Sequence, residues 1–157
     1  MKHLLLIALL VGCTKTNPWN IDSISAGDSR FNGARLRYIS AQRHPSLIFE
    51  MLKVGEEVQA FLSLTRYRLS PDCKTLVLTI HGETHEEAIV PHQGLMRVRL
   101  SSDTTNKLIQ ALQSGEKVDI LVDGFEESLE PGQFSGSFSK FVGRGHFFQN
   151  LIQGPIP

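Results

Sequence analysis

Three histidines and three glutamates lie between His81 and His92, and this density of imidazole and carboxylate groups is the first sign of chemistry in the sequence. His81 and His85 have the H-x-x-x-H spacing that places two imidazoles on one face of a helix in zinc enzymes. A helix is not favoured here, because His81 ends an alternating apolar run and Gly82 follows it directly. In an extended chain the two residues lie about 13 Å apart, whereas zinc–nitrogen bonds measure about 2.0 Å. We therefore expect a polar hairpin tip that turns at Gly82–Glu83, without a metal or cofactor.

The alternative is a metal-binding or hydrolytic enzyme that uses His81, His85 and His92. No G-x-S-x-G, Walker A, C-x-x-C or H-E-x-x-H motif supports an enzyme elsewhere in the chain. Cys73 lies in the turn-like sequence SPDCK, and it could be drawn with His85 or His92 as a nucleophile and base. No local motif favours that pair, so we expect no catalytic residues and a protein that is not an enzyme.

Three R-x-R pairs are the more informative feature, and they comprise Arg35/Arg37, Arg66/Arg68 and Arg97/Arg99. Each pair alternates with apolar residues, and in a strand residues i and i+2 share one face. One interpretation is that three solvated strand faces pair with the acidic residues of segment 116–130. The other is a basic strip for an anionic polymer or lipid head group, because the guanidinium fork grips carboxylate or phosphate with two hydrogen bonds.

The elements that would position these side chains are mostly short strands. From Arg35 onward, apolar segments of strand length alternate with turn residues, and Leu-Ile-Phe favours a strand over a helix across 46–53. One helix is expected near 103–114, with Asp103 as its N-cap and Gly115 at its end. Its apolar stripe is expected to consist of Leu108, Ala111 and Leu112.

The end of the chain is less regular. Segment 117–122 is expected to be a strand followed by an acidic loop, and segment 133–141 a final β-segment with phenylalanines in the core. The apolar tail 143–157 has no predicted placement. The pattern predicts a mainly β domain, an antiparallel β-sandwich or partly closed barrel of about seven or eight short strands with one α-helix.

Composition limits the classes of function. The chain has 157 residues, enough for one domain with a substantial core. Its 16 basic and 16 acidic residues give a formal net charge of zero, which argues against a nucleic-acid binder. The chain has only two cysteines, so it is not a disulfide-stapled scaffold if one of them is modified.

The N-terminus has the anatomy of a signal peptide. Lys2 precedes the apolar run Leu4–Val11, which is too short to span a bilayer, since a spanning helix needs roughly 20 apolar residues. The next residues, Leu10-Val11-Gly12-Cys13, resemble the lipobox of bacterial lipoproteins, although Val11 is less usual at its position than Ala or Ser. The resemblance covers only the first thirteen residues. It implies that Cys13 is acylated, with palmitate among the chains, and becomes the first residue of the mature protein.

The resemblance also implies an address in the bacterial cell envelope. Thr14 follows the cysteine in place of the Asp that resembles an inner-membrane retention signal, which favours the outer membrane in a diderm host. The expected organisation is a signal peptide at 1–12, a lipidated N-terminus and flexible tether at 13–34, and a single domain at 35–157. We expect an envelope lipoprotein on the periplasmic or outer side with a non-enzymatic binding or structural role. Its partners would be the membrane, through the lipid, and an anionic envelope component or another envelope protein.

Overall fold

The computed structural model describes residues 17–25, 33–42, 44–54, 56–92 and 94–152, and for residues 54 and 144–152 it describes the backbone alone. Within these ranges the chain forms nine strands and two helices. In chain order these are β1 (Trp19–Ile24), β2 (Gly33–Tyr38), β3 (Leu47–Val54), β4 (Glu57–Leu64), β5 (Thr75–Ile80), β6 (Glu83–Pro91), β7 (Arg97–Leu100), α1 (Ser102–Gln113), β8 (Val118–Val122), β9 (Phe125–Leu129) and α2 (Phe134–Ile152).

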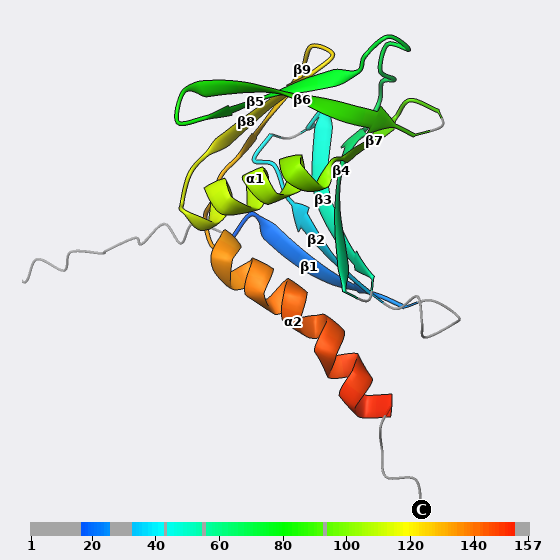
Figure 1. Cartoon of the computed structure of the whole chain (residues 1–157), viewed down its shortest axis with the longest axis vertical. Helices are drawn as coiled ribbons and strands as arrows, with labels where there is room; N and C mark the ends of the chain where they lie inside the picture. The colour runs from blue at the N-terminus through cyan, green and yellow to red at the C-terminus, as the bar shows by residue number, and fades with distance from the viewer. Residues whose placement is uncertain (1–16, 26–32, 43, 55, 93, 153–157) are drawn as a thin grey trace, which may run out of the picture.

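The nine strands form one antiparallel sheet in the order β1-β2-β3-β4-β7-β6-β5-β8-β9. β6 joins the two halves, because it pairs with β5 along most of its length and with β7 at its C-terminal end. The sheet bends until β9 lies near β3, but the two edge strands do not pair and the sheet stays open. Both helices pack on the inner face of this bend (Figure 1). The prediction of a mainly β, antiparallel fold is confirmed.

Alternation of side chains along the strands builds the core. In β2, Ala34, Leu36 and Tyr38 are buried on the inner face, while Arg35 and Arg37 lie between them on the outer face. The strand predicted across 46–53 is confirmed as β3, whose inward side chains continue the same core. One face of the sheet is therefore sealed by the helices, and the other lies outside the core.

Helix α1 follows the predicted pattern. Leu108, Ala111 and Leu112 are buried against the sheet, and the helix ends before Gly115, whose φ of +83° suits glycine. The N-cap is Ser101 rather than Asp103. The Ser101 hydroxyl accepts a hydrogen bond from the Thr104 backbone N–H at 3.0 Å, which places Asp103 inside the first turn.

The β-segment expected at 133–141 is wrong, because these residues begin helix α2. Phe134, Phe138 and Phe141 follow the i, i+4, i+7 spacing of a helix, and Phe134 and Phe141 are fully buried. Beneath the helix, the buried Lys53 of β3 donates from Nζ to the Val142 carbonyl. The interspersed serines and glycines have low helix propensity, so packing of the phenylalanines decides the structure here.

The flexible tether expected at 13–34 is also wrong for the part of that segment that the structure describes. Trp19–Ile24 forms edge strand β1, in register with β2 from Trp19 opposite Tyr38 to Ile24 opposite Gly33. Trp19 is only 3% exposed, and its ring packs on Tyr38, Phe49 and Phe134. The domain therefore begins well before Arg35.

The acidic loop expected before Pro131 contains strand β9. Asp123 and Gly124 form the tight turn between β8 and β9, both with positive φ, which is the conformation of a two-residue hairpin turn. The residues that follow β9 are hydrogen-bonded to strands β1 and β2, at the opposite edge of the sheet. Trp19 Nε1 donates to the carbonyls of Glu130 and Pro131 at 3.0 Å each, and the Glu130 backbone N–H donates to the Tyr38 hydroxyl.

Glu127 of β9 is a buried carboxyl group in this junction. Its side chain is 3% exposed; Oε1 accepts from the Ser40 hydroxyl at 2.9 Å and from the Ser128 backbone N–H, whereas Oε2 has no partner among the described residues. Burial is the main cause that raises the pKa of Glu127 above its ordinary value of 4.5. A raised pKa in the folded state means that the folded protein holds this proton more tightly than the unfolded chain.

Tighter proton binding by Glu127 in the folded state stabilises the fold. We expect this stabilisation to be complete below pH 4.5 and to be lost as the pH rises through the folded-state pKa of Glu127. Glu127→Gln removes the buried charge, so the variant should be more stable than the wild type at pH 7, by about 1–2 kcal/mol, and equal or less stable at pH 4. Urea unfolding of both proteins between pH 4 and pH 8 measures the difference, and the exposed neighbour Glu126→Gln serves as control. A difference that stays constant with pH would contradict the prediction.

Candidate functional site

The outer face of the sheet carries four of the six arginines singled out in the sequence. Arg35 and Arg37 lie on β2, and Arg97 and Arg99 lie on β7. We call these four residues the arginine face. The strand register places Arg37 opposite Glu50, Glu50 opposite Phe61, and Phe61 opposite Arg99, so these side chains form one row across four strands. The predicted alternation of arginine with buried apolar residues is confirmed on both strands.

Two arginines of the face are held by carboxylates. Arg35 Nη2 lies 3.0 Å from Asp22 Oδ2, and Arg97 Nη2 lies 2.6 Å from Glu50 Oε1. The Arg97 guanidinium also lies 3.9 Å above the ring centroid of Phe61, a cation–π contact. These partners lie on β1 and β3, so the expected pairing with segment 116–130 is wrong for both arginines.

The other two arginines of the face have no polar partner among the described residues. Arg37 is half-buried and Arg99 is exposed, and neither forms an ion pair or hydrogen bond with any described residue. Three strand spacings separate them, which corresponds to about 14 Å between their Cα atoms. Two permanent charges on a rigid sheet can bind two anionic groups of one extended ligand, or two separate head groups.

Arg66 and Arg68 do not join this face. They lie in the loop between β4 and β5 and are exposed, so the strand geometry expected for this pair is wrong. Cys73, His81 and His92 lie in three separate parts of the molecule.

The two-residue turn between β5 and β6 is formed by His81 and Gly82, one residue earlier than expected. His81 has a φ of 54°, and its Nε2 lies 2.5 Å from Glu116 Oε1. His85 lies opposite Leu78, so it is not beside His81 in the ladder.

His92 follows the opposite end of β6, and its ring packs edge-on against Phe61 with centroids 5.7 Å apart. At roughly 3.3 Å per residue, β6 separates His81 from His92 by more than about 25 Å. Together with Arg97, His92 covers Phe61, which is only 5% exposed despite its place on the outer face. No group of three or more His, Cys, Asp or Glu side chains in the described ranges is arranged to hold a metal ion.

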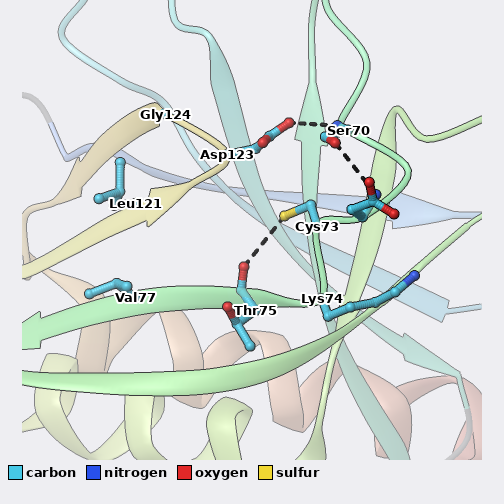
Figure 2. A pocket seen from close by; sticks show the side chains of 9 residues that line it. Ser70, Cys73, Lys74, Thr75, Val77, Leu121, Asp123 and Gly124 are labelled. Carbon is cyan, nitrogen blue, oxygen red and sulfur yellow. Dashed lines mark hydrogen bonds between the residues drawn. The ribbon is translucent and has the colours of Figure 1, made fainter.

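Cys73 lines a shallow hollow of about 430 Å³ between the β4–β5 loop and the β8–β9 turn. Figure 2 shows its thiol directed to the Thr75 carbonyl at 3.5 Å, and Asp123 Oδ2 accepting from the Ser70 backbone N–H at 2.6 Å. Burial, and to a smaller degree the negative charge of Asp123, raise the pKa of the Cys73 thiol. A thiol with a raised pKa is a poor nucleophile at neutral pH.

Cys13 and the lipobox lie outside the described residues. No helix in the described part of the chain has the length and apolar character needed to cross a bilayer. No protein family model, curated protein or solved structure gives a significant match to this chain.

Proposed function

We propose that the protein is a lipid-anchored component of the bacterial cell envelope with a non-enzymatic binding role, and that its arginine face binds an anionic envelope component. The observation that carries the binding role is that Arg37 and Arg99 have no carboxylate partner among the described residues and lie on a sheet face that neither helix covers. The lipobox resemblance at Leu10–Cys13 supports the anchor. Acyl chains on Cys13 would keep the domain next to head groups and envelope polymers.

The chemistry of the face suits phosphate or carboxylate groups. Guanidinium groups keep their charge at every physiological pH and bind both anions with paired, charge-assisted hydrogen bonds. Arg35 and Arg97 are already held by Asp22 and Glu50, whereas Arg37 and Arg99 have no ion-pair partner in the part of the chain that the structure describes and would provide the binding. Because the whole chain has no net charge, the attraction is local and screened beyond about 8 Å at physiological ionic strength.

We expect Arg37→Gln and Arg99→Gln each to weaken binding about tenfold, since a hydrogen bond to a charged group contributes about 1.5 kcal/mol. The double variant should lose most of the salt dependence as well. Binding is measured on phosphatidylglycerol vesicles and on a polyphosphate chain, at low and physiological salt, which separates a lipid head group from a free polymer. The free energy of unfolding should change by less than about 0.5 kcal/mol for each substitution.

The matched control is Lys117→Gln with Lys140→Gln, which removes two charges at exposed positions on β8's entry and on α2, away from the arginine face. This control should bind like the wild type. The proposal is contradicted if the wild type binds neither probe at low salt, or if the control loses as much affinity as the arginine double variant.

A further inference from the structure

The loop that carries Arg66, Tyr67 and Arg68 is fastened on both sides. Before it, Thr65 donates from its backbone N–H to the Ser46 carbonyl and from Oγ1 to the Pro45 carbonyl. After it, the Leu69 backbone N–H donates to the Leu95 carbonyl at 2.8 Å, and the Leu69 side chain is buried. The next residue is fixed to Asp123 by the hydrogen bond seen in Figure 2. Residues 66–68 are therefore a short, restrained segment.

Tyr67 presents an aromatic ring at the centre of this segment. Its ring stacks on Phe125 at the start of β9, with centroids 5.2 Å apart and an interplanar angle of 26°. Tyr67 nevertheless remains 54% exposed. Stacking holds the ring in a fixed orientation and leaves much of its surface open to solvent. A restrained, exposed aromatic ring loses little conformational entropy when a ligand packs on it.

Two positively charged residues are the sequence neighbours of Tyr67. Arg66 and Arg68 are exposed, and neither forms an ion pair or hydrogen bond with a described residue. The neighbouring carboxylate of Asp123 accepts the Ser70 backbone N–H instead. The segment thus combines one fixed apolar ring surface with two permanent charges whose long side chains can move to meet an anion.

From this combination we propose that the Arg66–Tyr67–Arg68 loop is a binding site for an acidic glycan. The apolar face of one sugar ring packs on Tyr67, and the carboxylates of that sugar or its neighbours pair with Arg66 and Arg68. The ring surface distinguishes this site from the arginine face, where Phe61 is covered and only charge is offered. The site lies outside the arginine face and does not depend on the function proposed for it.

The test is binding of oligogalacturonate, a chain of carboxylated sugars, with neutral dextran and phosphatidylglycerol vesicles as comparison ligands. The wild type should bind oligogalacturonate in preference to dextran. Tyr67→Ala should weaken binding about tenfold, an effect at the lower end of that found when a stacking ring is removed from a base-binding surface. Tyr67→Phe keeps the ring and should bind like the wild type. Arg66→Gln with Arg68→Gln should weaken binding and remove its salt dependence.

The control is Lys117→Gln with Lys140→Gln, which removes two positive charges from other parts of the surface and should leave glycan binding intact. Loss of glycan binding by Arg37→Gln with Arg99→Gln, with unchanged binding by the Arg66→Gln, Arg68→Gln variant, would assign the glycan to the arginine face and overturn the proposal for the loop. Equal affinity of the wild type for dextran, no binding of oligogalacturonate at low salt, or unchanged binding by Tyr67→Ala would each overturn it too.

Discussion

Trp19→Ala should lower the free energy of unfolding by about 3–5 kcal/mol, the range found for large aromatic side chains truncated in a core. The indole is almost fully buried, with Phe134 of α2 at 4.7 Å and Tyr38 of β2 at 5.0 Å between ring centroids. Its Nε1 also provides the hydrogen bonds that join β1 to the end of β9. Removing it empties the place where the edge strand, α2 and the last strand meet.

Chemical denaturation of the protein measures this loss. Trp19→Phe keeps an aromatic ring but leaves the carbonyls of Glu130 and Pro131 without this donor, so it should cost about 1–2 kcal/mol. Val90→Ala truncates an exposed apolar side chain on β6 and should stay within about 1 kcal/mol of the wild type. If Trp19→Ala costs no more than Val90→Ala, the N-terminal strand is not an integral part of the fold.

The strands and helix with regular patterns could be predicted from the sequence. Strict alternation in β2 settles which side chains are buried, because a strand has only two faces. β4 alternates in the same way except at Phe61, which is buried although it lies on the outer face. The apolar stripe of α1 and Gly115 define a helix in the same way. In these segments local preference and tertiary packing favour the same structure.

Three elements were missed, namely β1, α2 and β9, and the first two were missed because their local preferences are weak or misleading. β1 contains Asn20, Asp22 and Ser23, which are uncommon in strands, and only the burial of Trp19 and its pairing with β2 order it. The first turns of α2 contain Gly136 and several serines, although the spacing of the phenylalanines was a helical signal. The Asp123-Gly124 turn was also a readable hairpin signal for β9.

The arginine face could be predicted only in part. Alternation correctly placed the arginine pairs of β2 and β7 outside the core, because the face to which a residue belongs depends on its own strand alone. The partners Asp22 and Glu50 depend on which strands are neighbours, and strand order is not encoded in local pattern. The Arg66/Arg68 pair has the same sequence pattern, but the residues lie beyond the end of β4.

Attachment of lipid to Cys13 is expected to decide whether the protein is found in the membrane fraction or in the soluble fraction. Each buried methylene contributes about 0.8 kcal/mol, and two or more acyl chains are enough for stable anchoring in a membrane. The contacts proposed for the arginine face are weaker than this and depend on salt. Cys13→Ser should therefore move the protein from the membrane fraction almost entirely to the soluble fraction.

Metabolic labelling with radioactive palmitate in a bacterial host tests the proposed anchor most directly. Wild type and Cys73→Ser should both incorporate label and sediment with membranes, because Cys73 lies in the folded domain and plays no part in the anchor. Cys13→Ser should incorporate none and remain in the soluble fraction. Undiminished labelling of Cys13→Ser, or a wild-type protein that is soluble and unlabelled, would contradict the proposal that this protein is a lipid-anchored envelope component.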